Sequence, residues 1–347
     1  MDLLEQFKNY RKIDQREVLE RTETLPCDVF YLNEKTKSYV LLAKKGKESI
    51  TLKKIPGEKY ILKDDYNYYL DLIADKYKKF KKDFETKSED KSISFVEKVE
   101  ALYNYAETLV ESILGDPNNK TLLNESYVLS KHTFKLAGIN LSLINHLQKT
   151  RDLNKYTLGH SVNVFFAIAT FLNFIARKNR EFKQEEMVDM TFAALFHDIG
   201  LFNVPQEILM KPDKLTVEER KVIEHHPLEG RTILKSTLEA NEFLISERTL
   251  DMILYHHERM NGVGYPKKLK GSSIPFYART LAVCDVYIAM ISDKIYQKGK
   301  PPFDAITIMK NEMNELLDPL LVQYFIILLG PKDLMDQHLK KVDALSV

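Results

Sequence analysis

Several apolar helical segments in the middle of the chain end in, or are interrupted by, histidines and aspartates. His197–Asp198 follow residues 191–196, His256–His257 follow residues 250–255, and Asp285 lies within residues 281–290. A carboxylate is expensive to bury alone in an apolar helix, so it needs a cation or a hydrogen-bond partner. This segment can therefore pack only if its polar side chains find partners inside an otherwise apolar core.

The type and order of these residues indicate a metal site. Adjacent side chains on a helix diverge by about 100°, so a His–Asp pair can reach into one cavity, where the two carboxylate oxygens can bridge two cations. His160 precedes another apolar helix, and His226 stands directly before Pro227. A ligand set of imidazoles and carboxylates without thiolates suits iron, manganese or zinc better than a structural zinc knot.

Each of these residues has an ordinary alternative role. A single histidine is more often a core or surface residue than a ligand, and a single His–Asp pair occurs by chance in many chains. The combination of paired histidines with an aspartate in an apolar helix favours the metal site. We interpret His132, His146 and His338 as helix-surface residues, and His225 as a solvated neighbour of the site.

The chain is expected to form two domains. Residues 1–88 predict a small α+β module, with strands at 28–32, 38–43, 49–52 and 59–62 and a helix over 66–84. The polar stretch 85–92 marks the boundary, residues 89–120 predict a connecting helix, and residues 121–347 predict an all-α domain with the metal site in its core. Helices are expected over 95–114, 122–148, 158–178, 185–197, 246–256, 278–291 and 302–317, with one more opened by a capping box at Thr216.

Composition narrows the functional classes. Lys and Arg total 51 against 50 Asp and Glu, which argues against a broad basic surface for long nucleic acid. Two cysteines, Cys27 and Cys284, exclude a disulfide scaffold and are typical of the reducing cytoplasm. The most apolar segment, residues 162–176, is shorter than a membrane span and is interrupted by Asn163 and Asn173. We therefore expect a cytoplasmic protein without a membrane span.

The motifs together resemble those of the HD-GYP domain phosphodiesterases. The resemblance extends over residues 122–329. It is carried by the segments 197–200, 204–212, 215–219, 226–230, 256–266, 274–279 and 282–287. It implies an all-helical HD-type domain that holds two or three metal ions and hydrolyses cyclic di-GMP with a metal-activated water, to linear pGpG, GMP or both. Iron or manganese is expected, with zinc as the alternative.

The resemblance also implies roles for individual residues. The metal ligands would be His160, His197, Asp198, His226, His256, His257 and Asp285, with Asp198 bridging two metals as the central catalytic residue. Tyr265 falls where the family contacts its ligand, and we expect Gly264, Pro266 and Lys294 to line the substrate site with it.

Four positions depart from the family pattern. Leu201 stands where a lysine is frequent, Tyr156 where a glutamate that supports a third metal occurs, Asn163 where an arginine is common, and Gln297 where a cation is usual. We therefore expect two metals and a thinned phosphate-binding shell.

These departures leave three functional hypotheses. The first is a cyclic di-GMP phosphodiesterase, the second is a weakly active or inactive cyclic di-GMP receptor that keeps the metals, and the third is an HD-type hydrolase of another nucleotide. The first domain is interpreted as a regulatory or dimerising module, so a homodimer is an open option.

Overall fold

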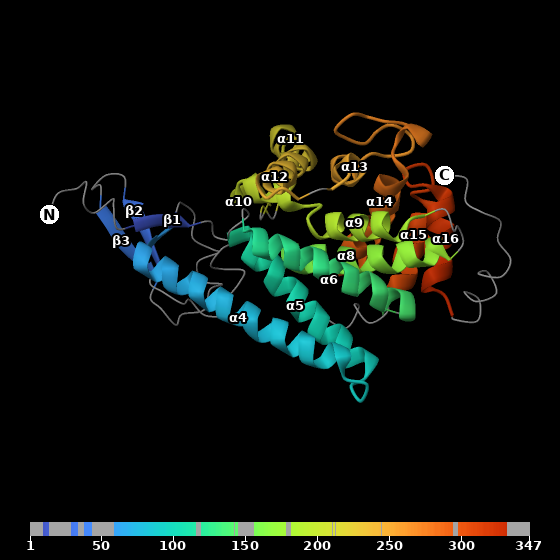
Figure 1. Ribbon diagram of the computed structural model, residues 1–347. Helices are drawn as coiled ribbons and strands as arrows, with labels where there is room; N and C mark the ends of the chain where they lie inside the picture. Colours follow the sequence, from blue (N-terminus) through green and yellow to red (C-terminus); the bar gives the residue numbers. More distant parts are fainter. Residues whose placement is uncertain are drawn as a thin grey trace. The chain divides into compact units, whose positions relative to one another are not determined.

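The computed structural model describes residues 10–13, 29–33, 38–43, 59–115, 119–141, 143–144, 156–177, 182–209, 211, 213–243, 245–293 and 298–331. The chain divides into two compact units, Met1–Asp83 and Phe84–Val347. Most of their helices and strands are labelled in Figure 1.

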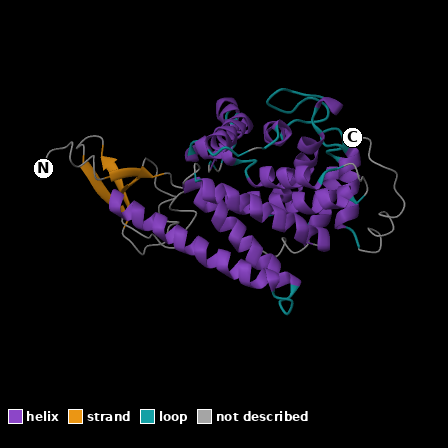
Figure 2. Ribbon diagram, in the orientation of Figure 1, coloured by secondary structure: helices purple, strands orange, loops and turns teal. Residues whose placement is uncertain are grey.

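The first unit contains a four-stranded antiparallel sheet, drawn in orange in Figure 2. Its strands are β1 (Tyr10–Ile13), β2 (Val29–Asn33), β3 (Ser38–Ala43) and β4 (Lys59–Leu62), in the order β1-β4-β2-β3. The sequence did not indicate β1, and the predicted strand 49–52 lies outside the described residues. The segments that connect these strands also lie outside the described residues. The α+β assignment of the first domain therefore stays a prediction.

The polar stretch expected as a domain boundary is partly helical. Helix α4 (Lys63–Glu89) continues through most of it. A tight turn then follows, in which Asp90 accepts the backbone N–H of Ser92. Helix α5 (Phe95–Gly115) begins with reciprocal hydrogen bonds between Ser94 and Glu97, the arrangement of a capping box. The polar stretch 85–92 therefore contains the end of α4 and the turn before α5. The predicted domain limits stay a prediction.

The regular elements described in the second unit are all helical, as predicted for this domain. After α5 they are α6 (Lys120–Ile139), α8 (Tyr156–Ala176), α9 (Gln184–Leu195), η2 (Ile199–Asn203), α10 (Gln206–Leu209), α11 (Val217–Glu224), α12 (His226–Ala240), α13 (Glu247–Tyr255), η3 (Gly271–Ser273), α14 (Phe276–Ile291), α15 (Pro302–Asn311) and α16 (Pro319–Leu329).

Some helix boundaries differ from the prediction. Helix α6 ends at Ile139 and not at residue 148, because Asn140 takes an extended conformation that interrupts the helix. Helix α15 ends at Asn311 instead of residue 317. Three further helices, α10, α12 and α16, were not predicted as helices. The expected capping box is present where Thr216 and Glu219 open α11.

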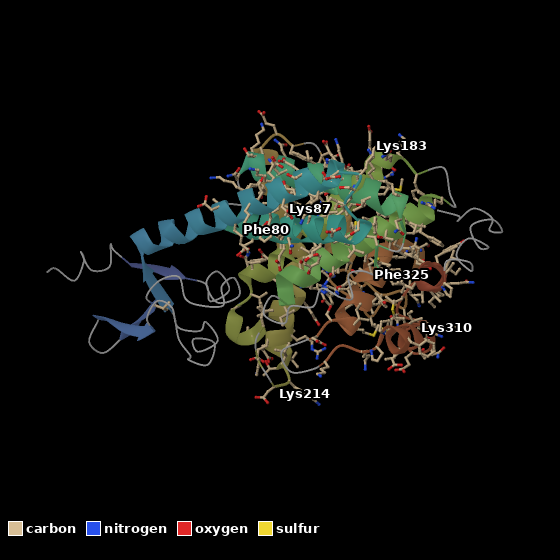
Figure 3. All side chains as sticks on the ribbon, turned by 90° about the horizontal axis from the view of Figure 1, so that it is seen from below. Phe80, Lys87, Lys183, Lys214, Lys310 and Phe325 are labelled. Carbon is tan, nitrogen blue, oxygen red and sulfur yellow. The ribbon has the colours of Figure 1, made fainter. Side chains whose placement is uncertain are left out.

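Helix α8 forms the centre of the second unit. It packs against α5, α6, α9, α14 and α16. Its segment Gly159–Ala176 has the length and apolar composition of a membrane-crossing helix, yet 78% of that segment is buried by the rest of the protein. Such burial is typical of a core helix. Phe325 of α16, labelled in Figure 3, packs edge-on against Phe171 of α8 and Tyr287 of α14.

This aromatic contact gives a test of the core. Phe325→Ala leaves a cavity between α8, α14 and α16 and should lower the free energy of unfolding by about 3–5 kcal/mol. Leu320→Ala, on the exposed side of the same helix, is the matched control and should cost much less. Chemical denaturation measures both; an equal loss in the two variants would contradict this packing.

Candidate metal centre

Asp198 lies at a sharp turn between two helical segments. Helix α9 ends at Leu195, and Asp198 is the residue that precedes η2. The next turn lies so close to α12 that a Cβ atom on Gly200 would come within 2.0 Å of the His226 carbonyl oxygen. Only glycine permits this approach. The glycine thereby brings the Asp198 carboxylate and the start of α12 to the same place.

The structure brings all seven predicted ligand residues together, in two groups. One group contains Asp198, His226, His256 and His257, and the other contains His160, His197 and Asp285. Within each group the candidate ligand atoms lie within 4.8 Å of one another. The residues come from α8, α12, α14 and the segments that follow α9 and α13. This His/Asp cluster could hold metal ions.

The two oxygens of Asp198 face different sets of histidines. Its Oδ1 lies 3.2 Å from Nε2 of His226 and 3.8 Å from Nε2 of His256. Its Oδ2 lies 3.3 Å from Nε2 of His197 and 3.8 Å from Nε2 of His160. Asp285 extends the second set, since its Oδ1 lies 3.0 Å from the same His160 nitrogen. Asp198 is therefore the residue that the two groups share.

Backbone carbonyls fix the orientation of three of the imidazoles. Nδ1 of His197, His226 and His256 lies 2.9, 2.7 and 2.6 Å from the carbonyl oxygen three residues earlier in each case. A carbonyl oxygen only accepts, so each Nδ1 carries the hydrogen and donates it. In the neutral ring, Nε2 is then left with a lone pair that points into the cluster.

These lone pairs face other acceptors. His226 Nε2 lies 3.5 Å from His256 Nε2, and both lie near the Asp198 carboxylate. The buried Nε2 of His197 makes no hydrogen bond, although Asp198 Oδ2 lies 3.3 Å away. Acceptors that face one another inside a protein need a proton or a cation between them. The donor set therefore fits metal ions.

Charge and burial set opposite pKa shifts within the cluster. Burial alone would lower the pKa of His197, but the adjacent Asp198 carboxylate raises it to about 9. Burial would raise the pKa of Asp198, yet His197 and the other imidazoles hold it well below its usual value. Burial and the neighbouring His256 hold the pKa of His257 well below the usual value. At pH 7 and without a metal, His197 thus keeps a proton that a bound cation would have to displace. The Asp198 carboxylate is charged and His257 is neutral, which are the forms that bind metals.

A partly exposed loop places the half-buried Tyr265 beside the cluster. The Tyr265 ring stacks on the His257 imidazole with 4.7 Å between ring centroids, and its backbone N–H donates to the His257 carbonyl. Packing requires a glycine at position 264, because a Cβ atom there would come within 2.5 Å of the Glu258 Cα atom. Contact of Tyr265, Gly264 and Pro266 with a ligand stays a prediction.

The remaining sequence positions fall in several places. Lys294 and Gln297 lie outside the described residues, as do His146 and His338. Leu201 is half-buried in η2. Asn163 lies one turn after His160 on α8, with a buried Oδ1 that has no hydrogen bond. The exposed His132 and His225 are placed as expected, and His225 Nε2 lies 3.3 Å from Glu229.

Sequence reasoning missed Glu258, which holds the Tyr265 loop. This carboxylate is 2% exposed, and it accepts the backbone N–H groups of Lys267 at 2.6 Å and Leu269 at 2.8 Å. Its position directly after the His–His pair and before a glycine-rich loop was the available signal. Because Glu258 satisfies two loop amides, it positions the segment that carries Tyr265.

The second unit matches a known protein family. The family model described as "HD domain" matches residues 143–321, which is half of the chain. The chain belongs to the HD domain family. This match includes all seven clustered residues.

Curated relatives match more than half of the chain. Cyclic di-GMP phosphodiesterase PA4108 of Pseudomonas aeruginosa is 35% identical over 198 residues, which cover 55% of this chain and 45% of the relative. A cyclic di-GMP phosphodiesterase of Thermotoga maritima is 29% identical over 203 residues, covering 58% of this chain and 52% of the relative. The chain therefore spans about half the length of these curated relatives. The matches confirm the resemblance to the HD-GYP domain phosphodiesterases.

A solved structure shares the fold. Bd1817, described as an HDG"Y"P protein from Bdellovibrio bacteriovorus, aligns with a TM-score of 0.60 over 93% of this chain and 100% of that chain. The identity is 18%, so this likeness concerns the fold alone.

Asp198 gives the sharpest test of the metal centre. Asp198→Ala removes the carboxylate shared by both groups, so metal retained after gel filtration should fall from about two ions per chain to fewer than one. Asp251→Asn, a half-buried aspartate of α13 outside the cluster, should leave the content unchanged. Plasma mass spectrometry measures both, and full metal content in Asp198→Ala would refute the shared-carboxylate arrangement.

Glu258 gives a test of the loop. Glu258→Gln replaces a charged acceptor of two amides and should destabilise the loop locally by about 1–3 kcal/mol. Hydrogen exchange followed by mass spectrometry should then show faster exchange in the peptide that contains Lys267 and Leu269. The exposed Glu312→Gln serves as control; unchanged exchange in Glu258→Gln would show that this carboxylate does not hold the loop.

Proposed function

We propose that this protein is a metal-dependent phosphodiesterase that hydrolyses cyclic di-GMP to linear pGpG, GMP or both. The observation that carries the proposal is the shared Asp198 carboxylate, whose two oxygens face separate sets of imidazoles. Relatives that are named cyclic di-GMP phosphodiesterases match 55% and 58% of this chain, and the HD domain match contains all seven clustered residues. Two ions, iron or manganese first and zinc as the alternative, suit this donor set.

The metals would be held in two groups that share one ligand. His226, His256 and His257 would hold one ion, and His160, His197 and Asp285 the other, with Asp198 between them. Bound metals of this kind lower the pKa of water and stabilise charge on phosphoryl oxygens.

The protein's own residues would orient the substrate and the ligands. The backbone carbonyls bound to Nδ1 keep three imidazoles turned toward the cluster. Burial, and then the Asp198 charge, raise the pKa of Tyr265 above its usual value. Its hydroxyl therefore stays protonated at neutral pH and can donate a hydrogen bond to a phosphate oxygen. Gly264, Pro266 and Lys294 would complete this side of the site.

A related substrate is the second candidate. A relative in Vibrio cholerae named 3'3'-cGAMP-specific phosphodiesterase 3 is 30% identical over 164 residues, which cover 47% of this chain. This observation favours testing other cyclic dinucleotides beside cyclic di-GMP. The receptor hypothesis, in contrast, has no support from the names of these relatives. We further propose a cytoplasmic location and a regulatory or dimerising role for the first domain.

Turnover by the metal-loaded protein tests the proposal directly. Anaerobically purified protein loaded with Fe(II) or Mn(II) should convert cyclic di-GMP to linear products, which chromatography separates. Asp198→Ala should lower the rate by at least about a thousandfold, because the shared ligand is lost. Asp251→Asn is the control. Bound ligand and bound metal without product would favour the receptor instead, and activity preserved in Asp198→Ala would refute the mechanism.

A further inference from the structure

A pocket of about 460 Å³ lies beside the metal centre, a volume within the range of small-molecule sites. It is lined by residues of η2, α11 and α12 and of the short segments that adjoin them. These are Gly200, Asn203, Val204, Lys221, Val222, His225, His226 and Glu229.

His226 belongs to both the pocket and the metal cluster. Its Nε2 lies 3.2 Å from Asp198 Oδ1, while the residue also lines the pocket. Gly200 contributes its backbone here, since its close contact with the His226 carbonyl keeps η2 against α12. A ligand in this pocket would therefore contact a residue that we propose as a metal ligand.

The Glu229 carboxylate, 39% exposed, lines the pocket and has two side-chain neighbours. Its Oε2 accepts a hydrogen bond from Asn203 Nδ2 at 3.2 Å, and its Oε1 lies 3.3 Å from His225 Nε2. A carboxylate offers about four lone-pair positions, so two contacts leave further acceptor capacity on the same group. Glu229 is thus an oriented acceptor that can still bind donors.

The rest of the lining adds apolar surface and one cation. Val204 and Val222 supply apolar contacts. Lys221 lies one helical turn before His225, so the two share a face of α11. The combination is therefore an oriented carboxylate, a nearby ammonium group and two branched apolar side chains.

We propose that this pocket binds a guanine base of a cyclic dinucleotide whose phosphate lies at the metal centre. The inference rests on the proposed function and adds a basis for base recognition. Guanine presents two adjacent N–H donors, N1 and N2, which a carboxylate accepts together. Its O6 and N7 are acceptors that a lysine can contact. The valines would pack on the faces of the ring.

The same chemistry disfavours adenine and a phosphate group. Adenine presents an acceptor at N1, which would face the Glu229 carboxylate without a proton between them. A phosphate would lie beside the negative charge of Glu229, and its attraction to Lys221 would be offset by that repulsion. A guanine base uses both charged residues of the pocket without this conflict.

The experiment measures base preference by competition. Cyclic di-GMP and cyclic di-AMP are mixed with the Mn(II)-loaded protein, and the ratio of their products gives the ratio of kcat/KM. This ratio does not depend on how much of the protein is folded or metal-loaded. The variant is Glu229→Gln, which keeps an acceptor for Asn203 and offers adenine the paired donor and acceptor of an amide. Glu218→Gln, an exposed glutamate of α11 outside the pocket, is the control.

The wild type and Glu218→Gln should prefer cyclic di-GMP. In Glu229→Gln the preference should fall by about tenfold to a hundredfold, the effect of losing a hydrogen-bonded charged acceptor. A ratio that is unchanged in Glu229→Gln, with cyclic di-GMP still hydrolysed, would overturn the guanine site and leave the proposed function standing. Equal weakening of both substrates in Lys221→Met would show instead that the pocket holds a phosphate.

Failure of the proposed function would give a different result. The wild type would then release no product from either dinucleotide, and equilibrium dialysis of the same proteins would measure the binding ratio. If the wild type binds cyclic di-GMP in preference and Glu229→Gln removes that preference, the pocket assignment stands without hydrolysis. If neither dinucleotide binds, both proposals are wrong.

Discussion

The second unit of this protein depends on one carboxylate that is only 12% exposed. Asp198 is placed between two sets of imidazoles, at the turn where α9 gives way to η2. Such a charge is tolerated in a protein interior only with compensating partners. The surrounding features serve this placement: Gly200 allows η2 to touch α12, and backbone carbonyls turn three histidines toward the carboxylate. The apolar helix α8, which carries His160 near its start, is buried along most of its length in the core.

Part of the cluster could be predicted from the residues alone, because they follow or interrupt apolar segments, whereas the full set of seven ligands is implied by the resemblance to the HD-GYP family. Asp285 inside α14 and His197 at the end of α9 contradict the pattern of their own helices, which is a signal readable without coordinates. Glu258 and Glu229 gave no such signal. Glu258 accepts hydrogen bonds from the backbone of Lys267 and Leu269, nine or more residues later in the sequence. Glu229 accepts one from Asn203, which lies in a different helical segment. Only the folded chain brings these partners together.

Helix boundaries could likewise be predicted only where a local signal marks them. The capping box at Thr216 is a local chemical feature, and it opens α11 as expected. Helix α12 begins directly after α11, with His225 standing between the two, so no glycine or polar loop separates them in the sequence. Helix α16 is short and nearly wholly apolar, which periodicity alone cannot assign. Its place against α8 and α14 is decided by packing of Phe325 with Phe171 and Tyr287.

Asp198 connects the two groups of candidate metal ligands in one centre. Electron paramagnetic resonance of the protein loaded with Mn(II) tests it most directly. Two ions bridged by one carboxylate, at a separation of about 3.5–4 Å, interact magnetically. A shared carboxylate predicts about two Mn(II) per chain and the spectrum of a coupled pair, replaced by that of isolated ions in Asp198→Ala. The six-line spectrum of isolated Mn(II) in the fully loaded wild type would contradict it.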